Sequence, residues 1–306
     1  MSRELLEKKL SELKSLAEES RIDIQDELLA LETGIQESTK TDKAWKRVEL
    51  ARHQERPYSL DYINRIFDKF TELHGDRAFG DDHAIIGGIA FLEGRPVTII
   101  ANQKGRTLEE RVYRNAGMAN AEGYRKALRL AKEAEKFRRP IITFVDTVGA
   151  YPGFGAEERG IGESIARNLR DFSQLKTPVI CIIIGEGGSG GALGICVGDK
   201  VYMLENATYS VISPEGCASI LLRDSSRAKD AAAMLRISSD DLLSFKVIDG
   251  VIAEPSGGAH TDPDAAAASI KEILIKDMSE LGHYDPLVLV RNRNMKIRSI
   301  GHYDEN

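Results

Sequence analysis

The sequence predicts a mixed α/β fold built around a largely parallel β-sheet, and three observations support this prediction. Strand-like and helix-like segments alternate through the middle of the 306-residue chain. Two strand segments, PIITFVD (140–146) and PVICIII (178–184), are apolar almost throughout, which is typical of strands buried on both faces of a parallel sheet. Each of them is followed by a glycine-rich loop and then by a helical segment. Because ligands gather at the carboxyl ends of such strands, these loops are the first candidates for a functional site.

The helices are expected from apolar spacing and from capping signals. Residues 59–73 are expected to form the first helix of the globular body, with Ser59 as its N-cap. We expect the basic side of the helix at 122–137 to be solvated. Apolar spacing predicts this helix and three more, at 157–174, 190–197 and 263–281.

Three further strands are expected from their β-rich composition. The runs 83–92 and 96–103 are joined by the short glycine-containing turn 93–95, which indicates a hairpin. KVYMLE (200–205) follows the second glycine loop and its short apolar helix. The order of elements from residue 140 is therefore β, α, β, α, β.

The first fifty residues differ from the rest, because apolar residues recur every three or four positions between charged ones. They are Leu6, Leu10, Leu13, Ala17, Ile24, Leu28, Leu31 and Ile35. We expect amphipathic helices that form an arm, which packs either on the chain's own body or on another subunit. The expected division is an arm at 1–54, a main domain at 55–282 and a polar tail at 283–306.

Composition excludes several classes of function. The chain is 42% hydrophobic and has a formal charge of −6, from 42 basic and 48 acidic residues, so it lacks the positive field of a nucleic-acid binder. The first residues have no apolar core of a signal peptide, and the longest apolar run, VICIII (179–184), is too short to cross a bilayer. A cytoplasmic protein without membrane or nucleic-acid partners is expected. Cys181, Cys196 and Cys217 show no metal-ligand spacing, so we expect buried thiols and no metal in this chain.

The stretch IIIGEGGSGGALGI (182–195) admits several interpretations. Gly185, Gly187 and Gly190 match a dinucleotide fingerprint, with Glu205 as the acidic residue, but the helix that follows is short. The glycines could also simply allow close packing of a buried helix.

The same stretch also matches the GxSxG nucleophile elbow of α/β-hydrolases. Ser189 would be the nucleophile, with Asp249 and His260 downstream in the required order. No second oxyanion motif accompanies it. A different interpretation uses the backbone: without side chains at Gly190 and Gly191, a substrate oxygen can approach main-chain N–H groups at the start of a helix, which would form an oxyanion hole.

The first glycine loop carries a family resemblance. DTVGAYPG (146–153), AEERG, IGEGGSGGALGI and TYSVISPEGCASIL resemble the alpha subunit of bacterial acetyl-CoA carboxylase carboxyltransferase. Further segments, among them ARHQERPYSLDYI, NQKGR, GMANAEGYRKALRL and EPSGGAH, occur in the family's order, so that the resemblance covers about residues 45–282. The resemblance implies a crotonase-like fold, related to that of ClpP, in which repeated ββα units form a spiral and an N-terminal helical arm precedes them.

The resemblance also implies a reaction and its partners. The alpha subunit acts with a beta subunit in an α2β2 assembly, and the beta subunit, not this chain, carries zinc. A carboxyl group moves from biotin on the biotin carboxyl carrier protein, which biotin carboxylase loads, to acetyl-CoA. The product is malonyl-CoA for fatty acid biosynthesis. Negative charge develops on a biotin oxygen and on the thioester oxygen, and each charge needs hydrogen-bond donors.

The resemblance assigns residues to these tasks. The donors to the biotin oxygen fall on Gly190 and Gly191, and the donors to the thioester oxygen belong to the beta subunit. Residues expected to line the biotin side are Gly149, Ala150, Tyr151 and Gly153, the last giving the turn its freedom. Lys104 and Arg106 of QKGR are candidate contacts for coenzyme A phosphates, or else a solvated pair. A serine hydrolase using Ser189 and a scaffold subunit with an inactive site remain as alternatives.

Overall fold

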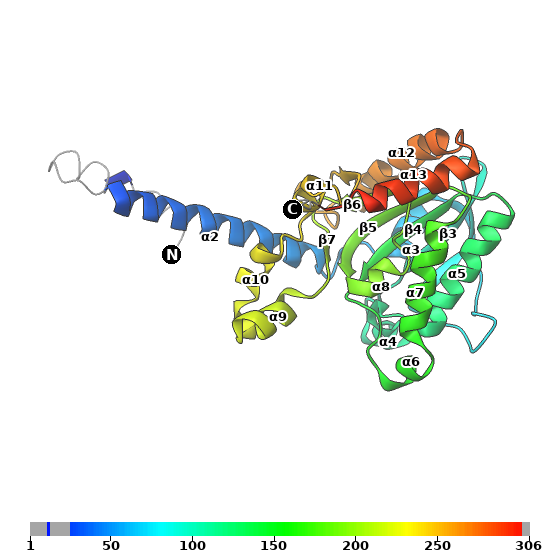
Figure 1. Cartoon of the computed structure of the whole chain (residues 1–306), viewed down its shortest axis with the longest axis horizontal. Coiled ribbons are helices and arrows are strands. Elements are labelled where there is room, and N and C mark those ends of the chain that lie inside the picture. The colour runs from blue at the N-terminus through cyan, green and yellow to red at the C-terminus, as the bar shows by residue number, and fades with distance from the viewer. Residues whose placement is uncertain (1–10, 13–24, 302–306) are drawn as a thin grey trace, which may run out of the picture. The chain divides into compact units, whose positions relative to one another are not determined.

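The computed structural model of the chain describes residues 11–12 and 25–301 (Figure 1). The chain divides into two units. The larger unit comprises Arg47–Ser213 and Ile237–Asn306, and the smaller comprises Met1–Lys46 and Pro214–Arg236. The larger unit contains the sheet and both glycine loops.

Eight strands of the described chain form a single sheet. In chain order they are β1 (Asp68–Glu72), β2 (Ile85–Leu92), β3 (Arg95–Asn102), β4 (Ile141–Thr147), β5 (Val179–Gly188), β6 (Lys200–Leu204), β7 (Thr208–Ser210) and β8 (Gly250–Ile252). The order across the sheet is β1-β2-β3-β4-β5-β6-β8, and β7 pairs with the end of β5. The pairs β1–β2 and β2–β3 are antiparallel, and the other pairings are parallel. The predicted largely parallel sheet is confirmed.

Helices cover the sheet of the larger unit. They are α3 (Ser59–Ile66), α4 (Leu108–Tyr113), the 3-10 turn η1 (Asn115–Gly117), α5 (Ala121–Lys136), α6 (Phe154–Glu158), α7 (Ile161–Ser173), α8 (Ser189–Leu193), α11 (Ser239–Ser244), α12 (Pro263–Leu281) and α13 (Pro286–Arg298). Helices α5 and α7 lie side by side, and α8 contacts α7, β4 and β5 (Figure 1). Helix α3 contacts β1, β4 and α12. All residues of β4 are buried, which accounts for its apolar composition.

The smaller unit holds most of the predicted arm. Helix α2 (Gln25–Ala51) begins in this unit and its last residues, from Arg47, belong to the larger one. The expected apolar positions Leu6, Leu10, Leu13, Ala17 and Ile24 lie outside the described residues. Leu28, Leu31 and Ile35 lie in α2, so a helix is confirmed there. The second segment of the unit contains α9 (Pro214–Cys217), η2 (Ala218–Leu222), η3 (Ser225–Arg227) and α10 (Ala228–Leu235).

The predicted helix at 59–73 is wrong in its second half. Helix α3 ends at Ile66, and β1 then pairs antiparallel with β2. The pairing with β2 overrides the helical spacing of the apolar residues. Ser59 is not the N-cap, because its hydroxyl donates to the carbonyl of Asn102 at 2.6 Å, and Tyr58 precedes the helix instead.

The other predicted helices have mixed outcomes. Helices 122–137 and 263–281 are confirmed as α5 and α12. Helix 157–174 is divided into α6 and α7, because Gly160 between them has a left-handed φ of 74°. Helix 190–197 is shorter than expected, since α8 ends at Leu193.

The basic side of α5 is solvated only in its second half, at Lys132 and Lys136, and its first half is buried or paired, which corrects the prediction in part. Lys126 is fully buried and its Nζ donates to Asp81 Oδ1 at 2.7 Å and to the Ile85 carbonyl at 2.8 Å. Arg125 Nε donates to Asp76 Oδ2 at 2.7 Å. Oδ1 of Asp76 also accepts the backbone N–H groups of residues 78, 79 and 80. These contacts fix the acidic loop before β2 onto α5.

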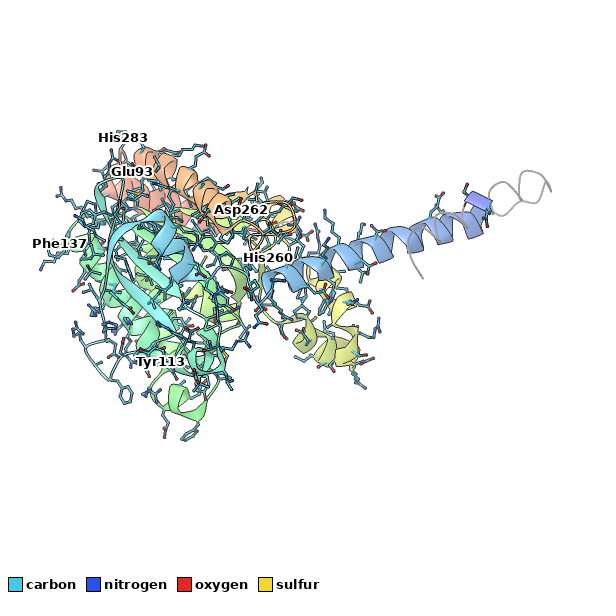
Figure 2. All side chains as sticks on the ribbon, turned by 180° about the vertical axis from the view of Figure 1, so that it is seen from behind. Glu93, Tyr113, Phe137, His260, Asp262 and His283 are labelled. Carbon is cyan, nitrogen blue, oxygen red and sulfur yellow. The ribbon has the colours of Figure 1, made fainter. Side chains whose placement is uncertain are left out.

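The predicted hairpin turn is confirmed. In the β2–β3 pair Leu92 lies opposite Arg95, which leaves a two-residue turn of Glu93 and Gly94. Both residues have left-handed φ values, 48° and 73°, as a turn that follows the twist of the strands requires. Glu93, labelled in Figure 2, forms an ion pair with Lys271 of α12 at 2.6 Å.

Residues 283–306, expected only as a polar tail, contain the helix α13, which contacts α7. Arg293 of α13 is buried, and Asp199 pairs with its guanidinium at 2.6 Å. The same side chain donates to three carbonyls that follow or end α7, namely those of Phe172, Leu175 and Thr177. The division of the chain at residues 54 and 282 stays a prediction.

Two expectations from composition also concern the structure. Cys181, Cys196 and Cys217 are free and buried, as expected. Among the residues that the structure describes, no helix has the length and apolar character needed to cross a bilayer.

Candidate active site at the carboxyl ends of the strands

The two glycine loops touch each other through their backbones. The first loop follows β4 and the second ends β5. A side chain at Gly188 would lie 2.1 Å from the Val148 carbonyl oxygen, and one at Gly191 would lie 2.4 Å from the backbone nitrogen of Ala150. Only glycine fits at such distances. The two candidate loops therefore lie together, at the same end of the parallel pair β4 and β5.

An irregularity in the sheet precedes this contact. Val145 pairs with Ile183, whereas Thr147 pairs with Gly187, so β5 has two more residues than β4 between these pairs. Within the irregularity, Oδ1 of Asp146 accepts the backbone N–H of Glu186 at 3.0 Å. The Asp146 side chain thus takes the place of a strand carbonyl, and irregularities of strand pairing are often found next to active sites.

The second loop places its backbone amides at the start of α8. Ser189 is exposed and has a left-handed φ of 52°. Gly190 is half-buried, and the nearest atoms to a side chain there would be those of Ile165 at 3.8 Å. The first N–H groups of a helix have no partner within it, and at the start of α8 Gly190 is half-buried while Gly191 is buried. Because α8 has only five residues, its dipole adds little, and the N–H groups themselves matter.

The first loop is held by hydrogen bonds within it and to a distant segment of the chain. The Thr147 hydroxyl donates to the Gly149 carbonyl at 2.8 Å and accepts the Gly149 N–H at 3.2 Å. The backbone N–H of Tyr151 donates to Ala119 at 2.9 Å. Gly153 has an ordinary φ of −80°, and the Tyr151 ring would lie 2.2 Å from a side chain there. Gly153 thus makes room for the ring, which corrects the expectation that it gives the turn its freedom.

Lys104 and Arg106 both have partners within the chain. Lys104 Nζ lies 2.7 Å from Asp146 Oδ1 and 3.1 Å from Glu186 Oε2. Arg106 pairs with Asp61 and lies 4.7 Å from the centre of the Tyr58 ring. The carboxylate partners of Lys104 were not predicted, although Asp146 opens the first glycine loop and Glu186 lies between Gly185 and Gly187 of the second.

A cavity of about 210 Å³ opens beside the first loop. Its lining includes Val148, Lys104 and Glu186, together with Arg52 and Arg111. Lys104 and its partner Glu186 therefore border this cavity. No group of three His, Cys, Asp or Glu side chains in the described residues is arranged to hold a metal ion.

The hydrolase triad does not assemble. Asp249 accepts from the backbone of Val201 and from Lys296, both at 2.7 Å, at the amino end of β6. Val201 lies opposite Cys181, near the start of β5, whereas Ser189 begins α8 directly after the other end of β5. The strand between them spans roughly 25 Å at about 3.3 Å per residue. His260, labelled in Figure 2, stacks on His53 with 3.8 Å between the rings.

Comparison with known proteins assigns the chain to a family. The family model of acetyl co-enzyme A carboxylase carboxyltransferase-like proteins matches residues 2–301. This chain belongs to the acetyl co-enzyme A carboxylase carboxyltransferase family. The acetyl-coenzyme A carboxylase carboxyl transferase subunit alpha of Treponema denticola is 68% identical over 296 residues, which cover 97% of each chain. The protein of the same name from Staphylococcus haemolyticus is 53% identical over 304 residues, 98% of this chain and 96% of the relative.

Solved structures show the fold of this family member. Transcarboxylase 12S, with methylmalonyl-coenzyme A and methylmalonic acid bound, has a TM-score of 0.60 at 22% identity, covering 72% of this chain and 41% of that chain. The beta subunit of geranyl-CoA carboxylase from P. aeruginosa has a TM-score of 0.57 at 16% identity, covering 77% and 44%. A Pseudomonas malonate decarboxylase hetero-tetramer in complex with coenzyme A has a TM-score of 0.58 at 16% identity, covering 72% and 90%. The predicted crotonase-like α/β fold is confirmed, and the hydrolase and dinucleotide interpretations are not supported.

Proposed function

We propose that this chain is the alpha subunit of a biotin-dependent carboxyltransferase that makes malonyl-CoA. Together with a beta subunit, it transfers the carboxyl group from carboxybiotin on the biotin carboxyl carrier protein to acetyl-CoA. This is the first committed step of fatty acid biosynthesis. The proposal is supported by the alpha-subunit relative at 68% identity, because the two chains align over 97% of their lengths.

The amides of Gly190 and Gly191 are proposed as the donors to the biotin ring oxygen. Carboxybiotin, when bound, would supply the carboxyl group, and loss of that group would leave negative charge on the ring oxygen. Gly190 fits such a group, because it is half-buried and a side chain there would meet only Ile165 at 3.8 Å, whereas Gly191 is buried against the first loop. Removing one preorganised donor of this kind costs about 3–4 kcal/mol of transition-state stabilisation.

The first glycine loop is proposed to line the biotin side of the same site. Gly149, Ala150 and Tyr151 are half-buried, and no atom would lie within 4 Å of a side chain at Gly149. The Tyr151 ring, for which Gly153 makes room, supplies an apolar surface for the flat ring system. Since charge stabilisation by backbone amides carries the chemistry, this chain needs no general base of its own.

The partners follow from the proposed reaction. A beta subunit completes an α2β2 assembly, supplies the donors to the thioester oxygen and holds zinc. The biotin carboxyl carrier protein delivers biotin, and biotin carboxylase recharges it. All of these components act in the cytoplasm. The coenzyme A phosphate contacts of Lys104 and Arg106 stay a prediction. Both side chains already have acidic partners in the chain, with which a phosphate would have to compete.

The deciding experiment reconstitutes the pair. The chain is purified alone and with a beta subunit, and carboxyl transfer from malonyl-CoA to free biotin is measured. Activity in the mixture and in neither chain alone is the expected result. Failure of the assembled pair to transfer the group would refute the proposal. An inactive scaffold is distinguished by Gly190→Val, because a scaffold would keep the turnover of the assembled pair unchanged.

A further inference from the structure

One lysine joins the bases of the two glycine loops. Asp146 is the residue before the first loop, and Glu186 lies within the second, just before its glycine run. Lys104 comes from the segment between β3 and α4, and its Nζ contacts both carboxylates, at 2.7 and 3.1 Å. Arg52 binds the other oxygen of Glu186 at 2.7 Å. Four charges thus alternate in sign along a chain of contacts.

This cluster is buried, so its charges interact strongly. The side chains of Lys104, Asp146 and Glu186 are 14%, 2% and 11% exposed. Burial alone would lower the pKa of Lys104, but the neighbouring charges of Asp146 and Glu186 raise it above its ordinary value. Burial alone would raise the pKa of Glu186, but Lys104 and Arg52 lower it. Removing one member of such a cluster leaves an uncompensated buried charge.

The cluster lies at the point where the sheet is irregular. Asp146 accepts the Glu186 N–H with the same Oδ1 atom that contacts Lys104. A side chain at Gly185 would lie 2.4 Å from that oxygen. Three strand ends, those of β3, β4 and β5, are therefore tied through one ammonium group to the backbone that leads to Gly190.

We propose that Lys104 is a positioning residue, which bridges Asp146 and Glu186 and so holds the glycine loops in the arrangement that aims the Gly190 and Gly191 amides at the substrate. This inference rests on the proposed function of those amides. It gives Lys104 an internal role in place of the coenzyme A phosphate contact expected from the sequence. A phosphate at Lys104 would also have to approach two carboxylates.

The test compares Lys104→Met with the unmodified chain, each assembled with the beta subunit. Malonyl-CoA and malonyl-pantetheine, which lacks the nucleotide and its phosphates, serve as carboxyl donors with free biotin as acceptor. We expect kcat to fall about 10- to 100-fold with both donors, less than the roughly 10²- to 10³-fold loss on removing an oxyanion donor. KM for malonyl-CoA should change by less than about twofold. A loss seen with malonyl-CoA and absent with malonyl-pantetheine would overturn the proposal in favour of a phosphate contact.

Two further variants separate positioning from general damage. Lys104→Met/Asp146→Asn removes one charge of each sign and keeps an oxygen that can accept the Glu186 N–H. Its log kcat should therefore recover by at least about a third of the drop in log kcat that Lys104→Met causes. Lys132→Met is the matched control, because Lys132 is 45% exposed and its acidic partners are 3.8 and 3.9 Å away. It should match the unmodified chain. A double variant no better than Lys104→Met would contradict the charge bridge.

A measurement without turnover keeps this inference separate from the proposed function. Hydrogen exchange at the Glu186 amide, bonded to Asp146 in the structure, reports directly on the irregular segment. We expect at least tenfold faster exchange in Lys104→Met, with amides of β2 unchanged. Unchanged exchange at Glu186 would refute the inference even if the assembled pair is active. An inactive pair with faster exchange in the variant would refute the proposed function alone. If Lys104→Met does not fold, Glu186→Gln replaces it in the kinetic assay, and an unchanged kcat would refute the bridge.

Discussion

Adding one methyl group at Gly191 tests whether the contact between the glycine loops sets the position of the amides. The new carbon would lie 2.4 Å from the backbone nitrogen of Ala150 and from the backbone carbon of Gly149, about 1 Å closer than the 3.4 Å at which ordinary contacts begin. Both obstacles are backbone, so no rotamer change can relieve them. The loops must separate by about 1 Å. We expect Gly191→Ala to cost about 1–3 kcal/mol of stability, as overpacking does, and about 100-fold in kcat, since a 1 Å misplacement costs that much.

Two neighbouring glycines supply matched controls. A methyl group at Gly190 would find only the Ile165 side chain at 3.8 Å, so Gly190→Ala should fold with at least normal stability. It should still lose kcat, because the methyl enters the space proposed for the biotin ring. Gly162, on the exposed side of α7, has no atom within 4 Å of the new carbon. Gly162→Ala should keep full activity and gain up to about 1 kcal/mol, since alanine favours a helix over glycine.

The assay combines carboxyl transfer from malonyl-CoA to biotin in the assembled pair with urea unfolding of each variant. The expected pattern is a loss of activity and stability for Gly191→Ala and a loss of activity alone for Gly190→Ala. A folded, assembled Gly191→Ala with normal kcat would refute the reasoning, because the loop contact would then not govern the amides.

Other predictions concern the rest of the larger unit. Ser189→Ala should keep at least about a third of the transfer activity in the assembled pair, whereas background activity would restore the hydrolase interpretation. Arg293→Met leaves Asp199 buried without its partner, so urea unfolding should show a loss of about 3–5 kcal/mol; a loss below 1 kcal/mol would contradict the buried pair. Three backbone N–H groups and Arg125 outweigh burial and lower the pKa of Asp76 from 3.8 to about 2. Because the pKa of Asp76 is lower in the folded than in the unfolded chain, this residue adds about 2 kcal/mol to the free energy of unfolding above pH 4. That contribution is lost as the pH falls from about 4 to about 2. Urea unfolding of Asp76→Asn should therefore differ from the unmodified chain at pH 6 and converge with it near pH 2, and a constant difference would refute the assignment.

The parts of the fold that depend on local pattern could be predicted from the sequence. The buried runs of β4 and β5 and the spacing of α5 and α12 all correspond to the expected elements. Errors arose where a distant partner decides the outcome. Residues 68–72 have helical spacing of apolar residues but form β1, because β2 offers an edge to pair with. The burial of Lys126 depends on Asp81, 45 residues earlier in the chain.

The site shows the same division. That both glycine loops lie at strand ends follows from the parallel order, and so does their proximity. The contact of Gly191 with Ala150 could not be foreseen, because it depends on the irregular pairing of β4 with β5. The role of Lys104 could not be predicted either, because no sequence pattern indicates which acidic residues a basic residue in a loop will contact. Its environment is set by two carboxylates 42 and 82 positions further along the chain.

The contacts of Arg293 have a consequence for the folding of the larger unit. The carbonyls of Phe172, Leu175 and Thr177 obtain this donor only from α13, more than a hundred positions later in the sequence. Until α13 docks, these three carbonyls lack the guanidinium donor, and water must hydrogen-bond to them in its place.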